Sequence, residues 1–334
     1  MSCGRSAVVF ILVTTTCLAV KGNNPPLCDA SGHCFENATI PSPRTEYSTR
    51  TKQQLSQWPG VVVKNQERAL QFAASPEQNA LIFLGDSIFE SYLGTSFGKP
   101  IERAEGVGEV MSHFAIFHEL STLVLAVSGD QTQHLLWRLQ SDGGGEMPAT
   151  LRRLERATIV LLIGTNNLAA GYTPADVALG VLAVVDFLLL SCRAKRVVVL
   201  ALLPRGDELR RICPPKQPRC SPFAGSFLPA VDHVNAAVKT GVEARAAAHA
   251  GHERLVSFVD CGAGFRFPLN ETNIVASSKH TRERRAGRRH GAMAVSAERS
   301  EVDIELMPDK LHPNAAGHKL LLNCLAEKIL TRAT

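Results

Sequence analysis

Beyond residue 22, the sequence has no hydrophobic run long enough to cross a membrane. A transmembrane helix needs about 20 consecutive apolar residues, whereas the best later candidate, residues 177–190, is shorter and contains Asp186. We therefore expect a buried helix there, and no transmembrane span once a cleavable leader has been removed.

Signatures of metal binding and nucleic-acid binding are also missing. No two cysteines are spaced as Cys-x-x-Cys, and no Cys/His cluster has the spacing of a zinc site. The formal net charge of +5 over 334 residues is modest, which does not indicate a nucleic-acid-binding protein. No internal repeat is present, and the 45% hydrophobic content is typical of a globular protein with a sizeable core. We expect neither a metal nor a cofactor.

Residues 1–22 have the pattern of a secretory signal peptide. Arg5 supplies a positive charge, residues 7–20 are uncharged and mostly apolar, and small residues precede a cleavage position near Ala19. An uncleaved membrane anchor is the alternative, but the apolar run is too short for a span. We therefore predict a secreted protein or one of the secretory-pathway lumen. The sequons at Asn37 and Asn270 are candidate glycosylation sites that fit this route.

The cysteines follow the same reasoning, because disulfides form in oxidising compartments. Of the nine cysteines, Cys3 and Cys17 would leave with the leader. Two pairs are close in sequence and lie in loop-like surroundings, so we predict the bridges Cys28–Cys34 and Cys213–Cys220. The other three leave an odd thiol, and their pairing stays open: they are Cys192, Cys261 and Cys324.

Short apolar runs alternate with helical patterns along most of the chain. The predicted strands are residues 81–84, 123–127, 158–163, 196–203 and 255–259. The predicted helices are residues 61–74, 109–120, 132–140, 173–192, 228–249 and 314–331. Strands that are apolar throughout and alternate with helices predict one five-stranded parallel sheet covered on both faces.

Two regions fall outside this alternation. Residues 23–75 form a predicted N-terminal extension ahead of a main domain at 76–334. Residues 23–57 are rich in Pro, Ser, Thr and charge, which predicts an extended leader. Residues 268–305 form a predicted disordered or surface insertion, and within it residues 279–290 are rich in Lys and Arg. The basic run is either a solvated segment, a contact for polyanions or a dibasic processing site.

Several predicted strands end in turns that carry reactive or hydrogen-bonding groups. Ser87 follows the first strand, Gly129 the second and Asn166 the third, while Asp309 and His312 precede the last helix. The carboxyl ends of parallel strands meet at one edge of a sheet, so these groups are expected to converge. Ser87 would be the nucleophile, His312 its base and Asp309 the residue that orients the imidazole. The backbone N–H groups of Ser87 and Gly129, with the Asn166 amide, would form an oxyanion hole.

The same residues resemble the blocks of the SGNH (GDSL-type) hydrolases, in the family's order and spacing over residues 80–330. The four blocks are Gly85-Asp86-Ser87, Gly129, Gly164-Thr165-Asn166-Asn167 and Asp309-Lys310-Leu311-His312-Pro313. The resemblance implies a flavodoxin-like three-layer α/β/α fold and ester hydrolysis through a Ser–His–Asp triad.

Within the family, residues 128–139, 164–167 and 202–206 look like the catalytic subunits of intracellular platelet-activating-factor acetylhydrolase. Those subunits remove a short acetyl group and pair as dimers, so the resemblance implies a small acyl-ester substrate, lipid or carbohydrate, and a homodimer. The signal peptide, the extra cysteines and the basic insertion depart from that pattern.

Other polar residues near these motifs have simpler interpretations. We expect Asp86 to brace the turn, His134 and Trp137 to pack within a helix, and Arg205 to form a structural salt bridge. The function that fits the sequence is a secreted serine esterase. The alternatives are a polysaccharide O-acetylesterase and a non-catalytic binding protein that uses the same fold.

Overall fold

The computed structural model describes residues 27–28, 34–48, 51–74, 79–140, 150–151, 157–192, 194–206, 227–248, 255–268 and 300–330. The predicted signal peptide, the Cys213–Cys220 pair, Asn270 and residues 279–290 lie outside these residues. Cys28 is described by its backbone alone.

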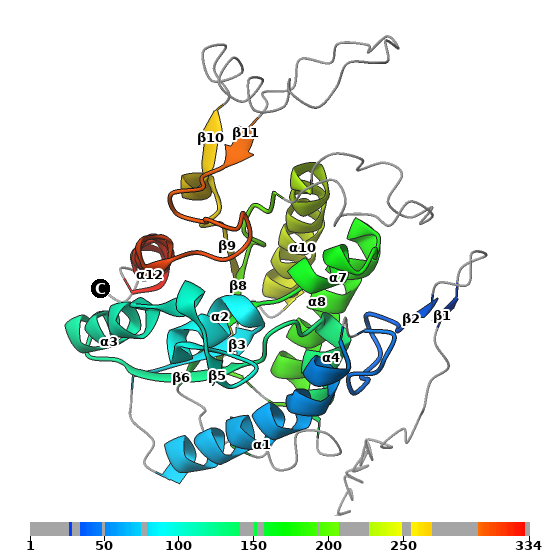
Figure 1. Cartoon of the computed structure of the whole chain (residues 1–334), viewed down its shortest axis with the longest axis horizontal. Helices are drawn as coiled ribbons and strands as arrows, with labels where there is room; N and C mark the ends of the chain where they lie inside the picture. The colour runs from blue at the N-terminus through cyan, green and yellow to red at the C-terminus, as the bar shows by residue number, and fades with distance from the viewer. Residues whose placement is uncertain are drawn as a thin grey trace, which may run out of the picture.

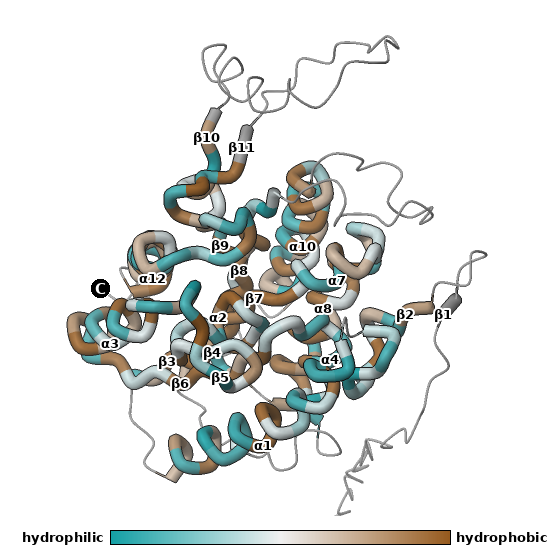
Figure 2. The backbone as a smooth tube through the Cα atoms, viewed as in Figure 1, coloured by the Kyte–Doolittle hydropathy of each residue, from teal (hydrophilic) through white to brown (hydrophobic). Residues whose placement is uncertain are grey.

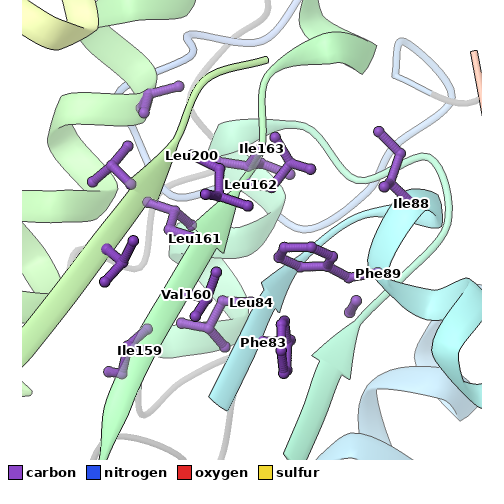
Figure 3. Packing of buried hydrophobic residues seen from close by; sticks show 14 of the residues in the cluster. Phe83, Leu84, Ile88, Phe89, Ile159, Val160, Leu161, Leu162, Ile163 and Leu200 are labelled. Carbon is purple, nitrogen blue, oxygen red and sulfur yellow. The ribbon is translucent and has the colours of Figure 1, made fainter. Parts of the chain in front are cut away.

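Five parallel strands form the central sheet, as predicted. They are β3 (Ala80–Gly85), β6 (Ser121–Ala126), β7 (Thr158–Leu162), β8 (Arg196–Leu200) and β9 (Leu255–Val259). Their order is β6-β3-β7-β8-β9, so β3 lies inside the sheet between β6 and β7. Every residue of β3 is buried, because helices cover both faces of the sheet. Figure 3 shows Phe83 of β3 next to Phe89, with the aliphatic side chains of β7 on the neighbouring strand. The Phe83 and Phe89 ring centroids are 5.2 Å apart.

The helices form a layer on each face, which gives the three-layer α/β/α fold (Figure 1). One layer contains α4 (Thr132–Leu139), α8 (Pro174–Leu190) and α10 (Leu228–Ala248). The other contains α3 (Val107–Phe117) and α12 (Ala315–Ile329). The predicted helix starts at Thr173 and Asn314 are N-caps, whose side chains accept the backbone N–H groups of Asp176 and Gly317.

Short helices and strands make up the rest of the described structure. They are β1 (Leu27–Cys28), β2 (Cys34–Phe35), α2 (Ser87–Glu90), η1 (Ser91–Leu93), β4 (Thr95–Ser96), β5 (Lys99–Pro100), η2 (Glu102–Ala104), α7 (Thr165–Ala169), η4 (Ala263–Phe265), β10 (Arg266–Pro268) and β11 (Ser300–Val302). Strands of two or three residues have no detectable hydrophobic period, and the sequence did not predict them.

The N-terminal part of the chain packs on the domain more closely than its composition indicates. Helix α1 (Lys52–Ala74) begins well before the predicted start at residue 61 and includes Pro59, so the prediction of extended chain was wrong for residues 52–57. Trp58 explains the early start, because it is buried and its indole donates to Asp130 Oδ1 at 2.8 Å. Figure 2 shows hydrophobic and hydrophilic bands alternating along α1, as expected for a helix buried on one side.

The base of the predicted insertion is ordered. Strands β10 and β11 pair antiparallel, with Phe267 opposite Glu301 (Figure 1). Val302 is buried, and the Asp303 backbone N–H donates to Phe265 O at 2.9 Å. Residues 300–305 therefore belong to the folded domain, and the predicted insertion was too long at its C-terminal end.

The cysteine pairing that the sequence left open is partly settled. Cys261, just after β9, forms a disulfide with Cys324 of α12. Cys28 and Cys34 are opposite each other in the β1–β2 pair, and Cys34 is disulfide-bonded. The Cys28–Cys34 bridge itself stays a prediction.

None of the helices in the described residues is long and apolar enough to span a membrane.

Candidate active site

Ser87 is the first residue of α2 and lies directly beyond the carboxyl end of β3. The turn before it requires glycine, because a Cβ at Gly85 would lie 2.4 Å from Leu162 O. Asp86 caps α2 by accepting the Ile88 backbone N–H at 3.1 Å, which is the bracing role that the sequence predicted. Ser87 is therefore held by the turn at the sheet edge where open α/β folds place their ligands.

His312 and Asp309 meet Ser87 in a continuous hydrogen-bond chain. Ser87 Oγ lies 2.8 Å from His312 Nε2, and His312 Nδ1 lies 2.6 Å from Asp309 Oδ2. The other oxygen of Asp309 accepts the backbone N–H groups of Leu311 and His312. Lys310 has a φ of +59°, which turns the chain tightly enough for these two bonds. The structure thus brings together three side chains that are up to 225 residues apart.

Charges and burial determine which atoms of this hydrogen-bond chain carry protons. Burial opposes ionisation of Asp309, but the ring and backbone hydrogen bonds from His312 and the Leu311 N–H outweigh it and lower the Asp309 pKa to about 2. An ionised Asp309 only accepts hydrogen bonds, so the proton of the neutral imidazole lies on Nδ1. Nε2 is then an acceptor for the Ser87 hydroxyl. Burial lowers the His312 pKa, and the charge of Arg103 adds to this against the opposing effect of Asp309.

Gly129 lies in the turn after β6 and has a φ of +74°, a backbone conformation that favours glycine. The backbone N–H groups of Gly129 and Ser87 donate to no backbone carbonyl among the described residues. Asn166, in α7, lies beside the same turn, and its Nδ2 donates to Asp130 O at 3.0 Å and to Asp86 Oδ2 at 3.1 Å. Both amide hydrogens are therefore used within the protein. An oxyanion contact from Asn166 would replace or share one of these bonds.

Asp86 is a fully buried carboxyl group next to Ser87. Burial raises its pKa to about 7, with Asp130 adding to the rise and the Ile88 N–H and the charges of Arg205 and Arg103 opposing it. Its proton state therefore changes near neutral pH.

A family model, the GDSL-like lipase/acylhydrolase family, matches residues 83–320. This span runs from the first strand of the sheet into the last helix, and it includes all five candidate site residues. The chain belongs to the GDSL-like lipase/acylhydrolase family. This membership confirms the resemblance seen in the motifs and accounts for the parallel sheet.

Known members of the family match parts of this chain. Platelet-activating factor acetylhydrolase IB subunit alpha1 of Homo sapiens is 40% identical over 93 residues, which are 28% of this chain and 36% of that protein. Subunit alpha2 of Gallus gallus is 38% identical over 93 residues, covering 28% of this chain and 37% of that protein. The match thus spans only about a third of these relatives. A solved carbohydrate esterase family 3 structure from Talaromyces cellulolyticus is 11% identical with a TM-score of 0.42, and the comparison covers 76% of this chain and 97% of that one.

The sequence did not predict a buried network next to the candidate site. Asp130, fully buried, accepts Arg138 Nε at 2.7 Å and Trp58 Nε1 at 2.8 Å, and lies 3.4 Å from Arg44 Nη2. Arg138 also donates to the carbonyl of Leu125, near the end of β6. A buried carboxylate is stable only with such partners. Arg138 lies within the matched region, whereas Trp58 and Arg44 precede it.

Glu90 is a second missed residue, fully buried three positions after Ser87. It accepts the Ser128 backbone N–H at 2.6 Å, the Gly98 N–H at 2.7 Å and the Thr95 hydroxyl at 3.0 Å. Glu90 therefore ties the Ser87 helix to the Gly129 turn. Its acidic side chain in a short apolar helix was the only signal in the sequence.

The remaining predicted residues lie near the site with structural contacts. His134 is fully buried, accepts the Gln131 N–H and bonds Glu36 Oε2 at 2.9 Å. Trp137 packs against Trp58 in a tilted arrangement, with ring centroids 5.2 Å apart. Arg205 donates to the Thr165 carbonyl at 2.9 Å, and its guanidinium lies over the Phe227 ring. The sequence predicted a salt bridge for Arg205 but neither of these two contacts. No group of three or more His, Cys, Asp or Glu side chains within the described ranges could hold a metal.

Proposed function

We propose that this acylhydrolase is a secreted serine esterase that hydrolyses a small acyl ester, with acetyl as the preferred acyl group. The observation that carries the proposal is the hydrogen-bond chain from Ser87 through His312 to Asp309. It joins a hydroxyl, a base with an accepting nitrogen and an ionised carboxylate in the order that nucleophilic catalysis needs.

The proposed reaction has two stages, acylation of Ser87 and hydrolysis of the acyl-enzyme. Ser87 Oγ attacks the ester carbonyl while its proton passes to His312 Nε2, and the imidazolium is stabilised by Asp309. The oxyanion is met by the N–H groups of Ser87 and Gly129 and by the Asn166 amide. The proton then passes from His312 to the leaving alkoxide. A water molecule, deprotonated by His312, attacks the carbonyl of the acyl-enzyme. The bond from this carbonyl to Ser87 Oγ then breaks, and His312 returns the proton to Ser87 Oγ as the acid leaves.

Two observations support a short acyl group. The relatives that match over 93 residues are named for acetyl hydrolysis, and the motif resemblance to their subunits pointed the same way. A panel of p-nitrophenyl esters from acetate to octanoate tests this preference. Hydrolysis that increases with chain length would contradict it.

The assignment of Ser87 is tested by Ser87→Ala. Loss of the nucleophile should reduce kcat for p-nitrophenyl acetate by roughly 10⁴- to 10⁶-fold, with the melting temperature nearly unchanged. Ser112→Ala is the matched control, because Ser112 is an exposed serine whose hydroxyl donates to the Gly108 carbonyl of its own helix. Normal turnover by Ser87→Ala would refute the proposal.

A binding protein without catalysis remains the alternative from another class. A fluorophosphonate reacts covalently only with an activated serine, so mass spectrometry should find the adduct on Ser87 and lose it in His312→Ala. Absence of the adduct in the native protein would favour the binding protein.

The predicted leader favours an extracellular substrate, which makes a polysaccharide O-acetate the second candidate. Release of acetate from O-acetylated xylan, compared with release from acetylated glycerophospholipid, distinguishes carbohydrate from lipid. Pairing as a homodimer and retention on heparin through residues 279–290 are further proposals. Both are measured on the secreted protein, by light scattering and by salt elution.

A further inference from the structure

Arg44, from the N-terminal extension, reaches the turn that contains Gly129. Its Nη2 donates to Ser128 O at 2.8 Å, and its side chain is only 2% exposed. The guanidinium also lies over the Phe97 ring, 5.2 Å from the centroid. Arg44, which precedes the region matched by the family model, is thus buried against the Ser128–Gly129 turn of the proposed oxyanion hole.

The carbonyl that Arg44 holds and the N–H of Gly129 belong to the same peptide group. A peptide group is planar, so fixing the direction of Ser128 O also fixes the direction of the Gly129 N–H. A charge-assisted bond to the oxygen also polarises the amide and strengthens its N–H as a donor. Both effects would act on the hydrogen that meets the oxyanion.

Contacts on other sides restrain Ser128, the residue whose carbonyl forms this peptide. Glu90 accepts the Ser128 N–H at 2.6 Å, and Ser96 Oγ donates to Ser128 Oγ at 3.0 Å. A Cβ at Gly129 would lie 2.8 Å from Arg44 Nη2, so the guanidinium fills the space that a side chain would need. Glu90 thus holds one side of Ser128 and Arg44 the other.

We propose that Arg44 is a positioning residue that aligns and polarises the Ser128–Gly129 peptide for the oxyanion. The inference rests on the proposed function, because it needs an oxyanion to stabilise. It gives the N-terminal extension a part in turnover, exerted through the Gly129 backbone rather than through contact with substrate.

Substitution of Arg44 should leave the surrounding network in place. Asp130 keeps the closer bonds of Arg138 and Trp58, at 2.7 and 2.8 Å, when the 3.4 Å contact with Arg44 is removed. The Arg44 Nε has no hydrogen-bond partner, so its loss leaves no acceptor unsatisfied. Ser128 O is the principal group that loses a donor.

The test compares Arg44→Met, Arg44→Lys and Trp58→Phe with the native protein on p-nitrophenyl acetate. Arg44→Met should lower kcat by about 10- to 100-fold, less than the loss of an oxyanion donor itself, with KM changed by less than about threefold. The affinity for a trifluoromethyl ketone, which forms a tetrahedral oxyanion on the serine, should fall by the same factor as kcat. Arg44→Lys should recover part of both losses.

Trp58→Phe removes a donor to Asp130 from the same extension without touching the Ser128 peptide. It should lower the melting temperature while kcat per active site, counted by fluorophosphonate labelling, stays at the native value. Native kcat in Arg44→Met, or a loss confined to KM or to the number of active sites, would overturn the inference. If Arg44→Met does not fold, native kcat and ketone affinity in Arg44→Lys would do so. Failure of the proposed function is seen separately, as native-level activity in Ser87→Ala.

Discussion

Opposing effects act on the pKa of His312. Burial and the positive charges of Arg103 and Arg205 lower its pKa, and the Asp309 carboxylate raises it, with a net lowering from the ordinary value of 6.5. The proposed base must be neutral to accept the Ser87 proton. Turnover should therefore persist below pH 6.5 and decline only as the pH falls through the lowered pKa.

Arg103 gives this expectation a direct test. Its Nη1 donates to Ser91 Oγ at 2.8 Å, and its charge acts on both His312 and Asp309. Arg103→Gln removes a positive charge that opposes protonation, so the His312 pKa should rise. The acid limb of kcat/KM, measured from pH 4.5 to 8, should move to higher pH.

Arg68→Gln serves as the control for that charge change, because Arg68 bonds Asn65 on α1. Its acid limb should coincide with that of the native protein. An acid limb in Arg103→Gln that stays in place or moves to lower pH would refute this account of the His312 pKa.

At the same scale, the sequence predicts the three residues of the hydrogen-bond chain better than the buried residues that hold the neighbouring turns. Ser87, Asp309 and His312 follow apolar runs or precede a helix, so their places in the sheet topology could be inferred. Arg44 and Glu90 have no such pattern, because their partners lie 84 and 38 residues away and follow from packing. The hydrogen bonds from the Asn166 amide to Asp130 O and Asp86 Oδ2 could not be predicted either, because they depend on the rotamer of one side chain.

At the scale of elements, strong local signals gave correct predictions. The apolar strands and the caps at Thr173 and Asn314 predicted the sheet and the starts of α8 and α12. Helix α1 was predicted too short because Pro59 and polar neighbours argue against a helix. Burial of Trp58 outweighs that local preference.

The Cys261–Cys324 disulfide acts at this scale, because it joins the end of β9 to the helix that follows His312. It closes a loop with a sequence separation of 63, for which loop-closure entropy predicts about 4 kcal/mol. Replacing both cysteines by alanine should lower the free energy of unfolding by about that amount. Urea denaturation monitored by circular dichroism measures the change.

The two single substitutions provide the comparison for the disulfide. Each breaks the same bridge and should lose nearly as much stability as the double variant. An unchanged urea midpoint in the double variant would show that the bridge does not stabilise the fold.

At the scale of the whole molecule, the extension supplies groups that the main domain needs. Glu36 pairs with buried His134 at 2.9 Å, and Tyr172 donates its hydroxyl to the Glu36 carbonyl. Burial opposes ionisation of Glu36, but bonds from His134, Thr45 and Gln133 lower its pKa to about 2. Trp58, Val61 and Val62 bury Val127, which follows β6. The described side chains between residues 35 and 73 thus contribute to the same core.

A chain of residues 76–334 should therefore fail to fold cooperatively, although the sequence places its domain start at residue 76. Asp130 would lose two of its partners and His134 would lose Glu36, and each unsatisfied buried group costs about 1–3 kcal/mol. Exposing the apolar side chains beneath α1 adds roughly 1.5–3 kcal/mol for each one. The sum is comparable with the total stability of an ordinary domain, about 5–15 kcal/mol.

Residues 23–334, the predicted mature chain, are the control and should show one cooperative thermal transition. An equally cooperative transition and native esterase activity in residues 76–334 would show that the extension is dispensable, and would also contradict a part for Arg44 in turnover.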